Sequence, residues 1–244
     1  MEQTDMSFRA EMTPDGFWSI EQNGVRCFLL EGMDEALLVD SCFGGELAEL
    51  CRLHASHPVQ LLLTHSDPDH TGCVEQFDYF HMHPSEFDRW CSMGHDLKKA
   101  IPIWEGETIE LSGNYLVGGY KLNVLNLPGH TPGSIGLLAK KRRFLIAGDV
   151  IQNSHIYMFG PGRNLGAYRA SLLKLMSLED SIDRIYCSHG DLVVHPSFIR
   201  QMYRFVNDIM RGVIKESEPA PAHLGLPENI RLFARDDCQI LLEV

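Results

Sequence analysis

Hydrophobic and polar residues alternate in short blocks along the first half of the chain, and these blocks predict strands joined by turns. Two apolar segments, 17–22 and 25–32, flank Asn23-Gly24, a pair typical of a β-hairpin turn. Segment 35–40 predicts a further strand. Segment 59–65 begins with an uninterrupted apolar run and predicts a buried strand, because it has no polar face.

Helices and further strands are predicted along the rest of the chain, and strands alternate with helices in both halves. Helical spacing of apolar residues predicts helices over 46–54, over Leu165 to Ser177, and over Pro196 to about Glu216. Strand-like blocks occupy 77–83, 108–113, 115–129, 134–141, 142–149, 184–191 and the end of the chain, 232–244. Strands and helices mixed in this way predict an α/β protein built as a layered sandwich. The 244 residues are enough for one large domain, and we predict a single domain over 1–244.

Five of the predicted strands end in a histidine or an aspartate. These residues are Asp40, His65, His130, Asp149 and His189, and Asp67, Asp69 and His70 follow directly behind His65. If the strands lie side by side, their carboxyl ends share one rim, which is where open α/β sheets bind ligands. Each residue alone is more often an ordinary loop or cap residue, and only their joint occurrence indicates a site.

The chemistry of these side chains points to bound metal. Neutral imidazole and carboxylate are standard ligands of zinc and iron. Several aspartates beside an apolar sheet also need a compensating charge, which divalent cations would supply. We therefore predict two divalent metal ions, zinc before iron or manganese.

Charge and cysteine content narrow the class of protein. The formal net charge is −12, and the one short basic run, 140–143, lies between two apolar blocks, where it predicts a turn. This balance argues against a nucleic-acid partner. Seven scattered cysteines without a CxxC pair predict reduced thiols. The polar N-terminus and the lack of a long apolar run predict a cytoplasmic protein with no membrane partner. The sequence does not indicate an oligomeric state.

The polar motifs together resemble those of the metallo-β-lactamase fold superfamily. Its first metal motif, H-x-H-x-D-H, corresponds to residues 65–70, and its later motifs correspond to LPGHTPGS at 127–134, AGD at 147–149 and CSHGD at 187–191. The resemblance implies an αββα four-layer sandwich with a binuclear site. It assigns His65, Asp67 and His130 to one metal, Asp69, His70 and His189 to the other, and Asp149 to a bridge between them. Asp40 would support a ligand from behind, through either a histidine or a backbone amide.

The chain departs from the family motif at Asp67, where the second histidine is expected. A carboxylate can still bind metal, and it adds negative charge that favours harder ions such as iron or manganese. The alternative is that Asp67 faces solvent and one metal is missing.

The resemblance implies a metal-dependent hydrolase, in which a metal-held hydroxide attacks a small ester, thioester, lactone or amide and Asp69 relays a proton. A glutathione-thioester hydrolase of this family has a C-terminal helical domain, and the single long helix predicted after His189 argues against that substrate. The alternative function is a diiron redox or sensor protein related to the flavodiiron type, without its flavin domain.

Candidate substrate residues lie in the segment after Asp149. His155, Tyr157, Arg163 and Tyr168 could reach over the site, and the Arg163 guanidinium could hold a carboxylate with two hydrogen bonds. An ordinary connecting loop explains the same segment.

Overall fold

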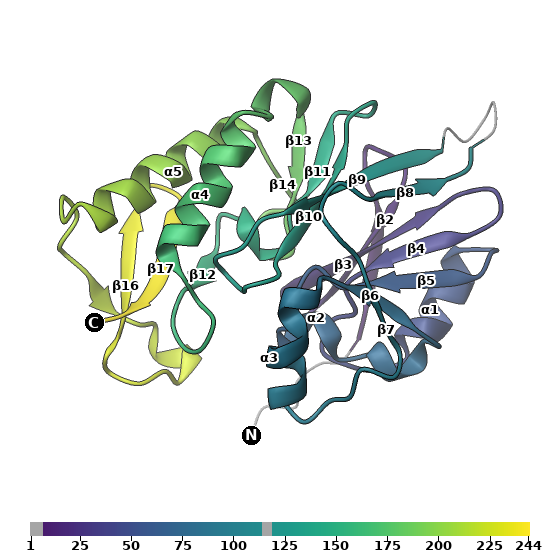
Figure 1. The fold of residues 1–244 in the computed structure, drawn as a ribbon, viewed down its shortest axis with the longest axis horizontal. Helices are drawn as coiled ribbons and strands as arrows, with labels where there is room; N and C mark the ends of the chain where they lie inside the picture. The colour runs from purple at the N-terminus through teal and green to yellow at the C-terminus, as the bar shows by residue number, and fades with distance from the viewer. Residues whose placement is uncertain (1–6, 114–118) are drawn as a thin grey trace. The chain divides into compact units, whose positions relative to one another are not determined.

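Residues 7–113 and 119–244 are described by a computed structural model, in which the chain separates into two units (Figure 1). Unit 1 contains the residues up to Leu125 together with 137–142, and unit 2 contains 126–136 and 143–244. The first residues of the predicted strand 115–129, and the first six residues of the chain, lie outside the described part. The single domain over 1–244 stays a prediction.

Unit 1 is built on one seven-stranded sheet whose strands follow in chain order. Strands β1 to β4 pair antiparallel and strands β4 to β7 pair parallel, so β4 has an antiparallel neighbour on one side and a parallel neighbour on the other. The strands are β1 (Arg9–Met12), β2 (Trp18–Gln22), β3 (Val25–Glu31), β4 (Ala36–Val39), β5 (Val59–Leu62), β6 (Phe80–Met82) and β7 (Ala100–Pro102).

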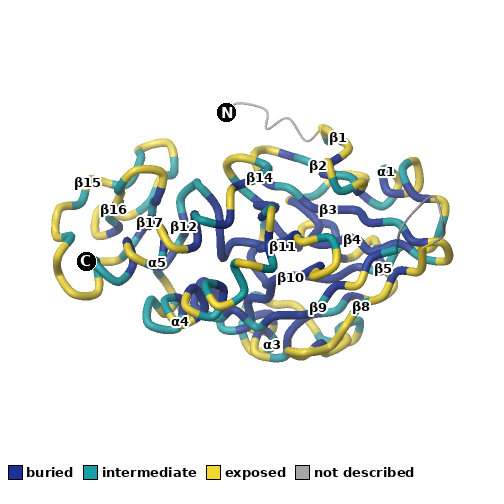
Figure 2. Tube along the Cα trace, turned by 90° about the horizontal axis from the view of Figure 1, so that it is seen from above, coloured by how far each residue is buried: buried dark blue, intermediate teal, exposed yellow. Residues whose placement is uncertain are grey.

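The register of this sheet explains its buried face. Leu29, Leu38, Leu61 and Phe80 are paired in one row across β3 to β6, so their side chains point to the same side. All four belong to one core cluster, and β3 is buried along most of its length (Figure 2). Residues of two helices complete this cluster, so both helices cover the same face: α1 (Leu47–His54) and α3 (Phe87–Ser92).

Shorter elements complete unit 1. The antiparallel pair β8 and β9 belongs mainly to this unit, whereas β10 has residues in both units. The bounds are α2 (Pro68–Thr71), β8 (Thr108–Leu111), β9 (Tyr120–Asn126), β10 (Ile135–Ala139), and the 3-10 helices η1 (Val74–Gln76) and η2 (Pro84–Glu86).

Unit 2 has two groups of strands and two long helices. In one group β11 pairs parallel with β13, which pairs antiparallel with β14, and in the other β17 lies between β12 and β16. The bounds are β11 (Phe144–Ile146), β12 (His155–Tyr157), α4 (Leu165–Met176), β13 (Arg184–Tyr186), β14 (Val193–Val194), α5 (Ser197–Met210), β15 (Glu218–Pro219), β16 (Ile230–Arg235) and β17 (Cys238–Glu243), with η3 (Gly148–Val150), η4 (Glu179–Ser181) and η5 (Ala222–Leu224) as 3-10 helices.

The long helix near the C-terminus is shorter than the sequence predicts. Apolar periodicity extends it to about Glu216, whereas α5 ends at Met210. Gly212 lies at φ 66°, a left-handed conformation that glycine adopts at helix ends. Val213 lies within the predicted helix but beyond the end of α5, and it is 65% exposed.

Six of the seven cysteines are buried, and Cys91 is exposed. Burial raises the pKa of Cys51 and Cys238 to about 12 and that of Cys73 to about 11. Because the thiolate is the reactive form, these thiols react slowly in the folded chain. We expect dithionitrobenzoate to modify one thiol of the native protein rapidly and seven after denaturation.

A Cys91→Ser variant serves as the control for this titration. It should remove the rapid phase and leave the other six thiols slow. Two or more rapidly modified thiols in this variant would contradict the buried positions.

Candidate metal centre

The aspartate- and histidine-rich loop of unit 1 begins where β5 ends. Asp67 directly precedes α2, whose first residue is Pro68, and α2 carries both Asp69 and His70. Proline is favoured at the first helical position because its fixed φ suits the helix and because an N–H there would have no acceptor within the helix. Asp67, Asp69 and His70 are thereby held on one short turn, just behind His65 in the chain.

Asp40 forms hydrogen bonds that hold this loop in place. It follows β4, the parallel neighbour of β5, and is almost completely buried. Its Oδ1 accepts a hydrogen bond from the Thr64 amide at 2.7 Å, and its Oδ2 accepts one from His70 Nδ1 at 2.9 Å. Asp40 lies at φ 65°, a conformation uncommon outside glycine and often associated with functional sites. The open question of its partner is answered with both a histidine and a backbone amide.

Thr64 orients the neighbouring histidine. Its hydroxyl donates to the Asp40 carboxylate at 2.8 Å and also lies 3.0 Å from His65 Nδ1. A hydroxyl has a single hydrogen, so Thr64 Oγ1 accepts from the Nδ1–H of His65. The lone pair of the neutral His65 ring is then on Nε2, the nitrogen that could bind a metal.

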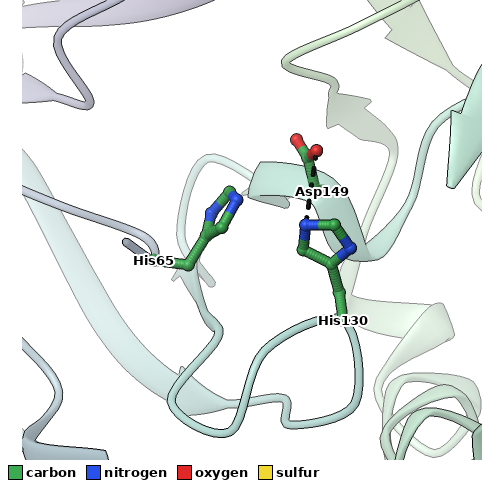
Figure 3. Close-up of side chains that lie close together, drawn as sticks. All are labelled: His65, His130 and Asp149. Atoms are coloured by element: carbon green, nitrogen blue, oxygen red, sulfur yellow. Dashed lines mark ion pairs between the residues drawn. The ribbon is translucent and has the colours of Figure 1, made fainter. Parts of the chain in front are cut away.

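Unit 2 contributes His130, Asp149 and His189. His130 Nδ1 donates to the carbonyl oxygen of Tyr157 at 3.0 Å, which again leaves Nε2 as the nitrogen that could bind a metal. Asp149 lies on η3, directly after β11, and is buried. Its Oδ2 lies 3.6 Å from His130 Nε2 and 3.5 Å from His189 Nε2. Figure 3 shows the His130–Asp149 pair, with His65 of unit 1 drawn as well.

The loop that presents His130 requires glycine at position 129. Gly129 lies at φ 139°, and a Cβ added there would be 2.3 Å from the backbone nitrogen of Tyr168. Neither the conformation nor the space permits a side chain. The LPGH segment is therefore pressed against α4, which fixes the direction of His130.

The spacing of these side chains fits metal ligands. In unit 1, His65 Nε2 is 3.5 Å from Asp67 Oδ2, and His70 Nε2 is 3.7 Å from Asp69 Oδ2. These separations, and the two at Asp149, exceed those of good hydrogen bonds. Two ligands about 2.1 Å from one zinc ion at tetrahedral angles are about 3.4 Å apart. The donor set of each unit therefore fits a divalent cation.

Asp67 differs from the other predicted ligands. Six of the seven belong to groups that could hold a metal ion, and within the described residues Asp67 is not a member of these groups. Its Oδ1 forms an ion pair with Arg89 Nη2 at 2.6 Å. Asp67 is 8% exposed, so it does not face open solvent.

A match to a protein-family model shows which family this chain belongs to. The model of the metallo-β-lactamase superfamily matches residues 21–86 and 92–189, more than half of the chain. The chain belongs to the metallo-β-lactamase superfamily. The matched residues include Asp40 and the predicted ligands of both units.

Relatives of this superfamily member include enzymes with named activities. It is 26% identical over 219 residues to a hydroxyacylglutathione hydrolase of Salmonella arizonae, covering 82% of this chain and 79% of the relative. It is 26% identical over 148 residues to the human acyl-coenzyme A thioesterase MBLAC2, covering 52% of this chain but only 53% of that protein.

Solved structures confirm the predicted fold class. A metallo-β-lactamase from Pontibacter korlensis matches with a TM-score of 0.67 at 15% identity, covering 83% of this chain and all of that one. The metallo-β-lactamase-like α/β fold is thus confirmed. As a member of this superfamily with hydrolases among its relatives, the chain is a metal-dependent hydrolase.

One further feature concerns membranes. In the described part of the chain, no helix of this superfamily member has the length and apolar character needed to span a bilayer.

The four candidate substrate residues have different surroundings. Tyr168 is completely buried, and its hydroxyl donates to the Val150 carbonyl at 2.7 Å, which argues against the predicted substrate contact. Arg163 Nη1 donates to the His130 carbonyl at 2.6 Å, so it holds the ligand loop. Tyr157 supports His130 through its own carbonyl. Burial, and then the charge of His223, lower the pKa of His155, which favours a neutral ring.

Two residues of this site were missed in the sequence. Thr64 orients His65, and its place beside the first motif was the available signal. Arg89 pairs with Asp67 from a separate helix, α3, and nothing in the residue order indicates that contact.

Proposed function

We propose that this chain hydrolyses a thioester of a small acid with two divalent metal ions. The observation that supports the site best is the common orientation of its imidazoles. His65, His70 and His130 are each held at Nδ1 by an oxygen of their own unit, while Nε2 is directed toward a carboxylate. A hydrogen bond at Nδ1 that orients the ring and leaves Nε2 available is typical of histidines that bind metals.

The proposed ligands follow the family assignment. His65, Asp67 and His130 would hold one ion, Asp69, His70 and His189 the other, and Asp149 would bridge them. The position of Asp149 Oδ2 within 3.6 Å of both His130 and His189 supports the bridge. Zinc is proposed before iron or manganese, because imidazole nitrogens are prominent among the ligands.

The chain's own residues would hold the substrate and move the proton. When bound, the two ions supply Lewis acidity and water of lowered pKa. Asp69 has the most exposed carboxylate among these ligands, with 23% of its side chain accessible. It is therefore the proposed group that transfers a proton to the departing sulfur.

The substrates named for two of the relatives contain the same class of bond, a thioester. A hydroxyacylglutathione hydrolase and an acyl-coenzyme A thioesterase both act, by name, on acyl–sulfur bonds. A thiol has a pKa of about 8.5, so it leaves as thiolate with little help from an acid. One partly exposed aspartate is sufficient for that task, whereas an alcohol or amine would require more assistance.

The test compares substrate classes on the metal-loaded protein. We expect hydrolysis of a short acyl-coenzyme A at least about tenfold faster, in kcat/KM, than that of the matching oxygen ester, because sulfur is the better leaving group. S-lactoylglutathione is the second thioester of the panel and tests whether the chain also accepts glutathione as the leaving thiol. A lactone and a β-lactam complete the panel, and released thiol is measured by absorbance.

Metal removal serves as the control. Dialysis against a chelator should abolish thioester hydrolysis, and added zinc, iron or manganese should restore it. Cleavage of the lactone or β-lactam with no thioester hydrolysis under any metal would overturn the proposed substrate. Full activity in the chelated protein would overturn the proposed mechanism.

A diiron redox or sensor protein is the second candidate, favoured by the carboxylate of Asp67. The ion pair with Arg89 offsets the negative charge on which that argument depends. Metal analysis and the visible spectrum separate the two functions. A colourless zinc protein supports hydrolysis, and a diiron protein with reversible oxidation supports the alternative.

A further inference from the structure

We propose that Arg89 is a positioning residue of the metal centre, which lets an aspartate act in the place of the family's second histidine. The inference rests on the proposed function, because it assumes that Asp67 is a metal ligand. Arg89 Nη2 lies 2.6 Å from Asp67 Oδ1, while Asp67 Oδ2 lies 3.5 Å from His65 Nε2. The two carboxylate oxygens therefore have different partners, and Oδ2 is the oxygen directed at the metal site.

Arg89 is itself fixed by the loop that it supports. Its Nη1 donates to the Ser66 hydroxyl at 2.9 Å and to the Ser66 carbonyl at 3.2 Å. The Ser66 amide and hydroxyl in turn donate to Glu86, a completely buried carboxylate just before α3. One guanidinium thus joins Ser66 and Asp67, and its planar fork suits two partners at once.

Helix α3 keeps this arrangement rigid. Trp90, the next residue along, is buried in the core of unit 1, and its indole donates to the Asp96 carbonyl at 2.8 Å. Arg89 therefore projects from an anchored helix, with 20% of its side chain accessible. Its position does not depend on a mobile surface contact.

Charge explains why the pairing matters for metal binding. A neutral histidine adds no charge to a site, whereas an aspartate adds one negative charge. The Asp67–Arg89 pair is neutral as a unit, so the total charge of the site equals that of the family's motif. Because Oδ1 is engaged by Arg89, Asp67 offers one oxygen, as a histidine offers one nitrogen.

This arrangement predicts that the family's own motif would fail in this chain. In an Asp67→His variant, the Arg89 guanidinium would lose its carboxylate and remain beside a bound cation. A largely buried cation without its partner is strongly unfavourable. Removing Arg89 as well should relieve the repulsion, so the effects of the two substitutions should not be additive.

The experiment is a double-substitution cycle of wild type, Asp67→His, Arg89→Gln and the double variant. Zinc content is measured by elemental analysis, and affinity by competition with a chromophoric chelator. We expect Asp67→His to weaken the weaker-binding zinc by about tenfold or more, a loss typical of altered support around a ligand. We expect Arg89→Gln to recover most of that loss in the double variant.

Arg26→Gln is the matched control. Arg26 forms an ion pair of similar length with Glu21, at 2.8 Å, between β2 and β3 of the same unit, with 11% of its side chain accessible. This variant should bind zinc as wild type does. If Arg89→Gln does not fold, Arg89→Met replaces it, since methionine also removes the positive charge and keeps a long, unbranched side chain.

The outcomes separate this inference from the proposed function. Equal losses from Asp67→His with and without Arg89, or no loss at all, would overturn the role of Arg89 while leaving the metal site intact. Wild-type protein that binds no metal would overturn both. The unfolding midpoints of the four metal-free proteins give a further readout. Because Asp67 and Arg89 form an ion pair, we expect the changes in midpoint caused by the two substitutions to be non-additive.

Discussion

Asp149→Ala is expected to abolish metal binding and hydrolysis together, with a fall in kcat/KM of about a thousandfold or more, at or beyond the upper end for loss of one electrostatic group in an active site. Asp149 is buried, and its Oδ2 lies within 3.6 Å of Nε2 of both His130 and His189. Its carboxylate is therefore the one group of unit 2 that both proposed metals require. The same loss is expected for His130→Ala.

The measurement pairs elemental analysis with steady-state kinetics. Asp149→Asn keeps the volume and removes the charge, so it should also lose metal, which shows that charge and not packing is responsible. Asp183→Ala removes an exposed carboxylate of the same unit, paired with Arg143, and should leave both metal content and rate unchanged. An active, metal-free Asp149→Ala protein would end the proposed mechanism.

The close placement of Asp40 and His65 could be predicted because the ends of parallel strands lie together. Asp40 and His65 follow β4 and β5, which pair in parallel, and the Asp40 amide donates to the Leu62 carbonyl. Apolar runs reveal where strands end, and a polar residue at that point is visible in the sequence. The joining of both units into one centre stays a proposal.

The role of Arg89 could not be predicted for a physical reason. Its contact with Asp67 depends on how α3 rotates against the sheet, and that rotation is set by the packing of Trp90 in the core. The order of residues does not indicate which polar side chain of α3 faces the loop. Contacts of this kind depend on tertiary packing.

Tyr168 shows the opposite error. A tyrosine in a segment beside the site suggests a substrate contact, yet its ring is enclosed and its hydroxyl bonds to the backbone. Short edge strands such as β14 and β15 were missed as well, because two residues give no periodicity.

Gly72→Ala is expected to produce the largest loss of stability among single changes in the loop from the end of β5 to the residue after α2. Gly72 has φ −64° and ψ −21°, which alanine adopts without strain. A Cβ there, however, would lie 2.0 Å from the carbonyl carbon and oxygen of Phe43, both backbone atoms. The Gly72 amide donates to the Cys42 carbonyl at 2.7 Å, so the two segments are held together at this point. One of them must move.

We expect this overpacking to cost about 3 kcal/mol or more of the free energy of unfolding. For a protein of this size, such a cost lowers the thermal midpoint by about 6–12 °C. Circular dichroism of the metal-free protein measures the change. Gly106→Ala is the control, because its φ of 86° also disfavours alanine but no atom lies within 4 Å of the added Cβ. It should cost only about 1 kcal/mol.

The comparison separates steric contact from backbone conformation. If Gly72→Ala lowers the midpoint no more than Gly106→Ala, the close approach of Phe43 is not rigid and the loop can relax. If it lowers the midpoint much further, the loop is fixed from both sides. Ser41 connects this contact to the ligands, since its amide donates to the His70 carbonyl at 2.7 Å. Movement at Phe43 should therefore weaken zinc binding as well, an effect that Gly106→Ala does not share.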